Sequence, residues 1–126
     1  MKVLIFGKSD IGEGIRQLYP DTINVPKEEC DVRDAKQIRS TIKKYNPDVI
    51  VNCAGVSHVQ VVKDSNIENL KEEIEVNLIG SYLIARESIA TNMFRPMIFI
   101  ASVAGMYGKP EHSGYSASKS GVISFV

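Results

Sequence analysis

Three short apolar runs constrain the fold of this chain more than any other feature of its sequence. They are rich in β-branched and aromatic residues and comprise Val3-Leu4-Ile5-Phe6, Val49-Ile50-Val51 and Met97-Ile98-Phe99-Ile100-Ala101. None of them alternates with polar residues, which is typical of strands that helices cover on both faces of a parallel sheet. The weaker run Thr22-Ile23-Asn24-Val25 predicts one more strand.

Segments of helical period lie between these runs. Apolar side chains recur at helical spacing over residues 35–45 and again over residues 74–89, and Pro20 is expected to end a first helix. Strands that alternate with helices imply right-handed crossovers between parallel strands. We therefore predict a single α/β domain over residues 1–126, with a doubly wound parallel sheet of about five strands. Ligands are expected at the carboxyl ends of these strands.

Charge and cysteine content narrow the range of partners. Fifteen Lys and Arg residues balance fifteen Asp and Glu residues, so we expect no nucleic acid and no membrane among the partners. Cys30 and Cys53 lack the spacing of a metal site, and we expect both to be reduced thiols in a cytoplasmic protein, with Cys53 as a small buried apolar side chain. The short apolar N-terminus predicts a strand rather than a signal peptide, and no apolar run approaches the roughly 20 residues that span a bilayer.

A glycine-rich turn follows the first apolar run and precedes a helical segment. It reads Gly7-Lys8-Ser9-Asp10-Ile11-Gly12-Glu13-Gly14-Ile15. Glycines let a backbone approach phosphates, and a helix N-terminus offers unpaired N–H groups with a partial positive charge. The turn therefore predicts the pyrophosphate site of a dinucleotide, with a plain turn as the alternative. The cofactor-binding residues predicted here are Gly7, Lys8, Ser9, Ile11 and Gly12.

The end of the second predicted strand bears on the choice of cofactor. An acidic residue about 20 residues beyond the glycines usually bonds the ribose 2′-hydroxyl of a dinucleotide. Here the region reads Val25-Pro26-Lys27-Glu28-Glu29. Lys27 and Lys8 could pair with a 2′-phosphate, whereas Glu28 could accept from a 2′-hydroxyl. NADP is slightly favoured over NAD, and a solvated charged loop explains the run as well.

Ser102, Tyr115 and Lys119 can converge on one carbonyl group. A predicted strand ends at Ser102, and a following helix places Tyr115 and Lys119 one turn apart on one face. A tyrosine phenol ionises near pH 10, and a neighbouring ammonium stabilises the phenolate. Tyr115 would then exchange a proton with a substrate oxygen that Ser102 polarises, while Lys119 could also hold the cofactor ribose. Taken alone, Tyr115 and Lys119 are better explained as a packed ring beside a solvated charge.

Three further motifs accompany this pair, and together they resemble the short-chain dehydrogenase/reductase family over nearly the whole sequence. Tyr115-Ser116-Ala117-Ser118-Lys119 resembles the Y-x-x-x-K signature of that family, and Asn52-Cys53-Ala54-Gly55 resembles its N-x-A-G element, which borders the cofactor. Asp31-Val32 resembles the pair that packs near the adenine, and Val76-Asn77-Leu78-Ile79-Gly80 resembles the helix that bears the catalytic Asn. Four elements in this order favour an inherited catalytic site over the packed-ring alternative.

The resemblance implies an NAD(P)-binding Rossmann fold and a set of residue roles. Asn77 would hold a water that relays protons through Lys119. The catalytic residues would be Asn77, Ser102, Tyr115 and Lys119. Besides the glycine-rich turn and Lys27, the cofactor-binding residues would be Asp31, Val32, Asn52, Ala54, Gly55, Tyr115 and Lys119. No metal is implied.

Two stretches depart from the family pattern. Gly7 and Gly12 are separated by four residues where the common form has three, or else Asp10 replaces a glycine in a loop that is one residue shorter. Asp10 would repel phosphates unless it points outward or caps the helix. The segment from Asp21 to Asp31 leaves no room for the usual helix between the second and third strands, and in this it is similar to sugar-nucleotide reductases of the extended branch.

The end of the printed sequence is a larger departure. Family members continue to a sixth strand and a substrate lid, whereas Val126 falls about two turns after Lys119. We expect a C-terminally truncated member of the family, whose uncovered apolar surface favours a homodimer or a higher homo-oligomer. The expected interface consists of the helices over residues 74–89 and 115–126, which resemble the dimerising pair of the family.

The resemblance implies an NAD(P)-dependent oxidoreductase that transfers a hydride between a nicotinamide cofactor and a small alcohol or carbonyl substrate. The alternative is a truncated, non-catalytic module that binds a nucleotide or forms oligomers. The substrate is not indicated by the sequence. His58, His112 and Tyr107 could line its pocket, and each also suits an ordinary loop.

Overall fold

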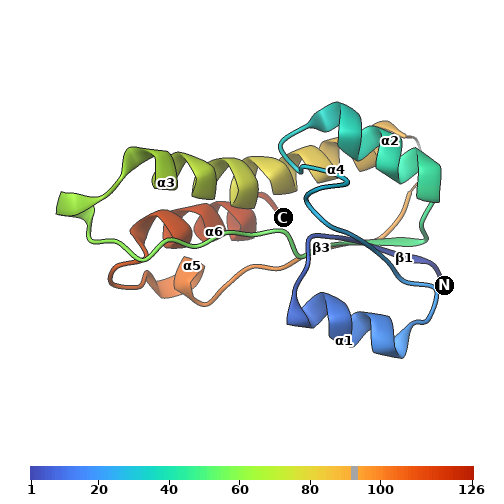
Figure 1. Ribbon diagram of the computed structural model, residues 1–126, viewed down its shortest axis with the longest axis horizontal. Coiled ribbons are helices and arrows are strands. Elements are labelled where there is room, and N and C mark those ends of the chain that lie inside the picture. Colours follow the sequence, from blue (N-terminus) through green and yellow to red (C-terminus); the bar gives the residue numbers. More distant parts are fainter. Residues whose placement is uncertain (92–93) are drawn as a thin grey trace.

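The structure, a computed structural model, describes residues 1–91 and 94–126. Strands and helices alternate along the chain as the apolar runs predict (Figure 1). In chain order the elements are β1 (Val3–Phe6), α1 (Asp10–Leu18), β2 (Ile23–Val25), α2 (Ala35–Tyr45), β3 (Val49–Asn52), the 3-10 helix η1 (Val62–Asp64), α3 (Ile67–Glu73), the π-helix η2 (Ile74–Ile79), α4 (Gly80–Ala90), β4 (Met97–Phe99), α5 (Ala104–Tyr107) and α6 (Ser113–Phe125).

The strands form one parallel sheet in the order β2-β1-β3-β4. Phe6 pairs with Val25 on one side and with Asn52 on the other, and Asn52 in turn pairs with Phe99. The carboxyl ends of the strands therefore meet at one edge of the sheet. The predicted doubly wound α/β fold is confirmed, although the described residues contain four strands where about five were expected.

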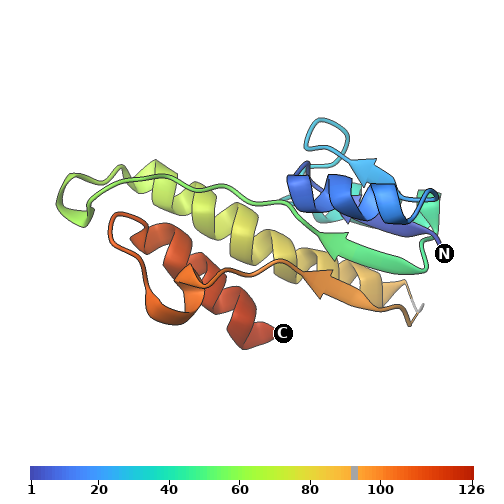
Figure 2. The same cartoon turned by 90° about the horizontal axis from the view of Figure 1, so that it is seen from below.

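Helices cover both faces of the sheet. Leu4 and Phe6 of β1 point into a core shared with residues of α2 and α4, whereas Val3 and Ile5 point to the other face, where Ile15 of α1 packs against them. Figures 1 and 2 show α1 alone on its side of the sheet and α2 with α4 on the opposite side. Burial on both faces is the reason that these strands lack polar alternation.

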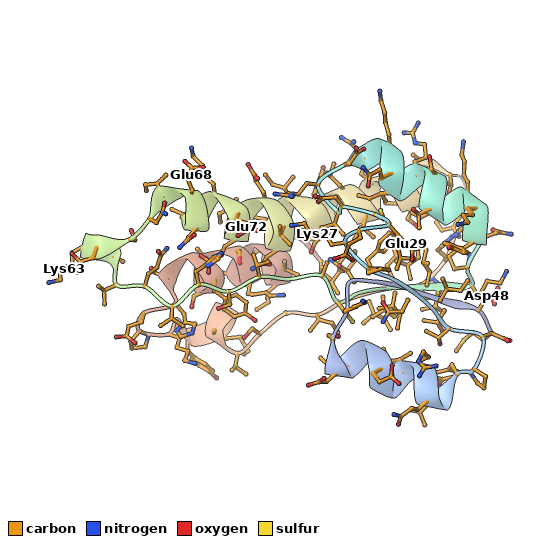
Figure 3. The ribbon with its side chains drawn as sticks, in the orientation of Figure 1. Lys27, Glu29, Asp48, Lys63, Glu68 and Glu72 are labelled. Atoms are coloured by element: carbon orange, nitrogen blue, oxygen red, sulfur yellow. The ribbon has the colours of Figure 1, made fainter. Side chains whose placement is uncertain are left out.

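A long helical rod composed of α3, η2 and α4 extends beyond the sheet, and α6 lies beside it (Figures 1 and 2). Glycines allow two close approaches along this rod. A Cβ at Gly80 would lie 2.7 Å from Cγ2 of Val32, and one at Gly121 of α6 would lie 2.7 Å from Cδ2 of Leu78. The far tip of the molecule is formed by η1, where Figure 3 shows Lys63.

The segment between β2 and α2 is as short as the sequence predicts. After Val25 the chain passes through turns to Asp34, whose carboxylate caps α2 by accepting from the N–H groups of Lys36 and Gln37. No helix intervenes in this fully described stretch. Asp31 and Val32 consequently lie in the loop that leads to α2, close to the carboxyl edge of the sheet.

Candidate active site

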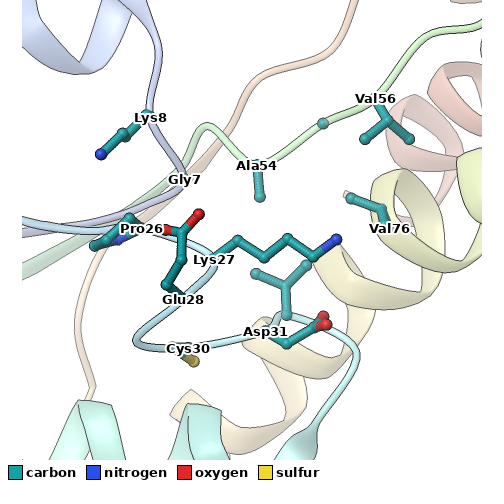
Figure 4. A pocket seen from close by; sticks show the side chains of 12 residues that line it. Gly7, Lys8, Pro26, Lys27, Glu28, Cys30, Asp31, Ala54, Val56 and Val76 are labelled. Atoms are coloured by element: carbon teal, nitrogen blue, oxygen red, sulfur yellow. The ribbon is translucent and has the colours of Figure 1, made fainter.

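A cleft of about 180 Å³ opens at the carboxyl ends of β1, β2 and β3. It contains seven of the predicted cofactor-binding residues, which are Gly7, Lys8, Lys27, Asp31, Val32, Ala54 and Gly55. In Figure 4 the side chain of Lys27 extends across this cleft toward Val76, while Lys8 lies at the opposite side. Residues from three separate loops are thus brought together at the place that the fold predicts for a ligand.

Other predicted cofactor residues lie outside the lining of this cleft, namely Ser9, Ile11, Gly12, Asn52, Tyr115 and Lys119. Some lining residues were not predicted from the sequence, namely Pro26, Cys30, Val56 and Val76. Pro26 and Val76 lie inside runs that were singled out for other residues, whereas Cys30 and Val56 lie one position outside a motif. Considering every residue of each motif and its direct neighbours would therefore have found them.

The glycine-rich turn owes its shape to two local features. Gly7 has a φ of +88°, and a Cβ at this position would lie 2.6 Å from Cα of Ala54, so only glycine fits between β1 and the loop after β3. Ser9 caps α1, since its hydroxyl accepts from the N–H of Gly12 at 3.0 Å. Asp10 is exposed as the first residue of α1. Asp10 was expected either to point outward, away from bound phosphates, or to cap the helix. The structure supports the outward position, because Ser9 is the residue that caps α1.

Charges of both signs line the cleft. The carboxylate of Asp31 is held by the guanidinium of Arg33, with Nη2 2.6 Å from Oδ2 and Nε 2.9 Å from Oδ1. This hydrogen bonding lowers the pKa of Asp31 from 3.8 to about 2. The remaining charged groups of the lining are Lys8, Lys27 and Glu28.

Lys119 is buried at the junction of α6 with the carboxyl edge of the sheet. Its side chain is only 6% exposed, and Nζ donates to the carbonyl oxygen of Ile100 at 2.7 Å. Nζ also lies 5.7 Å from the centre of the Tyr115 ring. Burial lowers the pKa of the ammonium, because desolvation disfavours its charged form. The predicted proximity of Lys119 to Tyr115 is therefore present.

Lys119 also lies close to the loop that follows β3. A Cβ at Gly55 would be 3.7 Å from Lys119 Nζ and 3.4 Å from Asn77 Oδ1. Residues of the loop after β3, of η2 and of α6 that are far apart in the sequence are thus neighbours here. Gly55 also lines the cleft at the carboxyl ends of β1, β2 and β3, so this cleft lies next to the helix that bears Tyr115 and Lys119.

Ser102 lies in the segment that joins β4 to α5. Its hydroxyl accepts from the N–H of Ala104 at 3.2 Å, and the residue is partly buried. The short helix α5 packs directly on α6, since a Cβ at Gly105 would lie 2.7 Å from the carbonyl carbon of Lys119. The hydroxyl of Ser120 in turn donates to the carbonyl oxygen of Gly105. These contacts hold the Ser102 segment beside the helix of Tyr115 and Lys119.

Asn77 lies fully buried in the π-helix η2, a type of helical distortion that is frequent at functional sites. Its amide bonds the backbone of Val56 twice, accepting from the N–H and donating to the carbonyl oxygen, each at 2.8 Å. Nδ2 also donates to the hydroxyl of Ser118, which donates to the carbonyl oxygen of Tyr115 at 2.7 Å. Asn77 therefore ties the loop after β3 to the helix that carries Tyr115.

The residues of the N-C-A-G motif have separate roles. Asn52 accepts from the N–H of Ala54 at 3.0 Å and donates to the hydroxyl of Ser81 at 2.9 Å, so it connects the end of β3 with α4. Cys53 was predicted to be a small buried apolar side chain, and it is a free thiol that is partly buried against the core on the α1 side of the sheet. Desolvation nonetheless raises the pKa of the Cys53 thiol.

The three residues proposed for a substrate pocket differ in their surroundings. The Nε2 atom of His58 lies 2.9 Å from Oε2 of Glu72, whereas Nδ1 of His112 lies 3.0 Å from the carbonyl oxygen of Pro110. Tyr107 is 83% exposed at the end of α5. Both histidines thus have local partners.

Residues 1–91 and 94–126 contain no group of three or more His, Cys, Asp or Glu side chains arranged to bind a metal ion. None of the helices in this part of the chain combines the length and the apolar character that crossing a bilayer requires.

Comparison with known proteins assigns a family. A family model described as short chain dehydrogenase matches residues 10–126. The 3-oxoacyl-(acyl-carrier-protein) reductase of Synechocystis sp. is 36% identical over 93 residues, which cover 70% of this chain and 37% of that protein. The chain spans less than half of the length of such relatives.

Solved structures show the same fold. A 4-hydroxyisoleucine dehydrogenase complexed with NADH and succinate superposes with a TM-score of 0.83 at 23% identity, covering 98% of this chain and 68% of that one. The F189W variant of the actinorhodin polyketide ketoreductase with NADPH superposes with a TM-score of 0.72 at 23% identity, covering 98% of this chain and 51% of that one. Fold, motif order and the family match agree, and the chain belongs to the short chain dehydrogenase family.

Proposed function

We propose that this chain forms the cofactor-binding and catalytic part of an NAD(P)-dependent oxidoreductase acting on a small alcohol or carbonyl substrate. The observation that carries the proposal is the meeting of buried Lys119 with Tyr115, Asn77 and Gly55 beside a cleft at the carboxyl edge of the sheet. The chain spans less than half of the length of the 3-oxoacyl-(acyl-carrier-protein) reductases that it matches, so the activity of the whole protein is part of this proposal.

The cleft suits a dinucleotide in shape and in chemistry. Gly7 lets the end of β1 pass directly against Ala54, so the turn that leads from β1 to α1 stays tight and without a side chain at this position. The N-terminus of α1, which begins at Asp10, adds the partial positive charge that phosphates prefer. The apolar residues Val32, Val56 and Val76 line the cleft and could pack on an adenine ring. When bound, the dinucleotide would supply or accept the hydride.

Side chains of the protein would carry out the proton transfer that accompanies hydride transfer. Tyr115 would exchange a proton with the substrate oxygen, and the nearby Lys119 ammonium would stabilise the phenolate that remains. Ser102 would donate its hydroxyl hydrogen to the same oxygen and so polarise the carbonyl group. Asn77 would keep Tyr115 in place through Ser118 and could carry the water that relays protons to Lys119.

NADP remains the slightly favoured cofactor. Two lysines and one glutamate line the cleft, and the carboxylate of Asp31 is already engaged by Arg33. A 2′-phosphate would gain two cations, Lys8 and Lys27, whereas a 2′-hydroxyl would have Glu28 as its acceptor. Known structures of the fold include proteins with NADPH and with NADH, so both cofactors belong in the test.

The test separates binding from catalysis. Titration of the chain with NADPH and with NADH, followed by nicotinamide fluorescence, measures binding, and NADPH oxidation with diacetyl as a small carbonyl substrate measures turnover. Tyr115→Phe should abolish turnover while sparing NADPH binding. Equal activity in this variant would reject the assigned role of Tyr115. Binding without any turnover in the unaltered chain would instead favour a non-catalytic nucleotide-binding module.

We also propose that the chain associates as a homodimer or a higher homo-oligomer through residues 74–89 and 115–126. Several apolar side chains of these segments are exposed, namely Ile79, Tyr82, Ile89 and Ile123. Exposed apolar surface of this kind favours association. A purely monomeric species in analytical ultracentrifugation at micromolar concentration would reject this part of the proposal.

A further inference from the structure

Glu73, the last residue of α3, is a completely buried carboxylate that makes a single hydrogen bond within residues 1–91 and 94–126. It is 0% exposed, and its Oε1 atom accepts from the backbone N–H of His58 at 2.7 Å. Its Oε2 atom has no hydrogen-bond partner among the described residues. Burial of a carboxylate is costly unless the surroundings compensate its charge.

The Oε2 atom faces the first turn of α6. A Cβ at Gly114 would overlap Oε2 and would lie 3.3 Å from Cδ of Glu73, so the carboxylate rests directly against the backbone of Gly114. The helix α6 comprises 13 residues, and the side chain of its N-cap residue His112 makes no capping hydrogen bond. The start of this helix thus lacks a cap from its own sequence.

A carboxylate in this position is favourable for a specific electrostatic reason. The first N–H groups of a helix have no partner within the helix, and together they carry a partial positive charge. The interaction is stronger where water is excluded, as it is around Glu73. The negative charge of Glu73, which belongs to α3, can therefore compensate the partial positive charge at the N-terminus of α6. It would act where the side chain of the N-cap residue forms no hydrogen bond.

We propose that Glu73 is a positioning residue that fixes the first turn of α6, and with it Tyr115, against the loop after β3. One oxygen holds the backbone of His58 in that loop, and the other faces Gly114, the residue before Tyr115. The inference rests on the proposed function only in its assumption that Tyr115 transfers the proton. The assigned contact between Glu73 and α6 does not depend on catalysis.

The decisive variant is Glu73→Gln, which keeps the shape of the side chain and can still accept from His58 but removes the charge that faces α6. We expect the amide hydrogens of the first turn of α6 to exchange about tenfold faster. We also expect kcat of NADPH oxidation with diacetyl to fall about tenfold at an unchanged KM for NADPH, because the cleft is intact while Tyr115 is displaced. The matched control is Glu72→Gln, whose partner is the imidazole of His58, and it should leave exchange in α6 unchanged.

A reciprocal pair of variants tests the contact itself. Gly114→Ala should impair folding or accelerate amide exchange in α6, because its methyl group would overlap Glu73. Adding Glu73→Ala should relieve that overlap and partly restore protection in α6. Exchange and kcat that are unchanged in Glu73→Gln would overturn the proposal, as would a Gly114→Ala defect that Glu73→Ala leaves in full. Absence of turnover in the unaltered chain would instead count against the proposed function, since the exchange experiment still reports on Glu73.

Discussion

Lys119 donates a 2.7 Å hydrogen bond from its ammonium to the carbonyl oxygen of Ile100, at the point where the chain leaves β4. The bond joins the helix that carries Tyr115 to the carboxyl edge of the sheet. It also provides an acceptor for a charge that is almost completely buried. The same lysine thus supports the local structure and stands beside the proposed proton donor.

Replacement of this lysine should affect both roles. In Lys119→Met the Ile100 carbonyl loses its donor and the phenolate of Tyr115 loses its cation, so we expect turnover to fall by about 100-fold or more. Measurement of kcat with NADPH and diacetyl, beside fluorescence titration with NADPH, checks this expectation. Lys63→Met, at the exposed tip of the molecule (Figure 3), is the control and should behave like the unaltered chain. Full turnover in Lys119→Met would contradict the role of the ammonium.

Replacement by alanine should change the free energy of unfolding in opposite directions at two glycines of the glycine-rich turn. Gly7→Ala forces a side chain into a backbone with φ of +88° and into contact with Ala54, so we expect a loss of about 3 kcal/mol in the free energy of unfolding. Gly14 lies within α1, and a Cβ there would meet nothing within 4 Å. Gly14→Ala should therefore stabilise the chain by about 1 kcal/mol through helix propensity. Urea unfolding followed by circular dichroism distinguishes the two, and equal effects would refute the argument.

The sequence predicts the sheet well because the relevant signal is local. Unbroken apolar runs such as 3–6 and 49–51 require cover on both faces, and the glycine-rich turn and the tyrosine–lysine spacing are visible within short windows. The expected neighbourhood of Tyr115 and Lys119 needed only the geometry of one helix. Where neighbouring positions settle the structure, a single sequence is sufficient.

Long-range pairings were beyond such reasoning. The bonds of Asn77 to Val56 and Ser118 depend on how the helical rod lies against two other segments. The contact of Glu73 with Gly114 joins residues 41 positions apart, and neither the sequence around Glu73 nor the sequence around Gly114 indicates it. Tertiary packing decides both of these contacts. The ion pair of Asp31 with Arg33 joins residues only two positions apart, but a pairing of two side chains in a loop leaves no pattern in the sequence.

Lys27 offers a test of cofactor preference. Its side chain crosses the cleft in Figure 4, and a positive charge there would favour a 2′-phosphate. We expect Lys27→Glu to weaken NADPH binding about tenfold while changing NADH binding less than threefold. Lys36→Glu, an exposed change in α2, controls for the altered net charge. A parallel loss of both cofactors in Lys27→Glu would argue against selection at the 2′ position.

The ion pair of Asp31 and Arg33 should make stability depend on pH in the acid range. Because the pKa of Asp31 is lowered from 3.8 to about 2 in the folded chain, the unfolded chain binds more protons between these values. The pair therefore stabilises the fold fully above the unfolded pKa, and this contribution disappears as the pH falls through the folded pKa. The side chains are 27% and 35% exposed, so solvent screening limits the effect to about 1 kcal/mol. Asp31→Asn should flatten the corresponding part of the stability curve in urea unfolding from about pH 5 to about pH 2. Curves for Asp31→Asn and the unaltered chain that stay parallel over this range would show that the pair contributes nothing to stability.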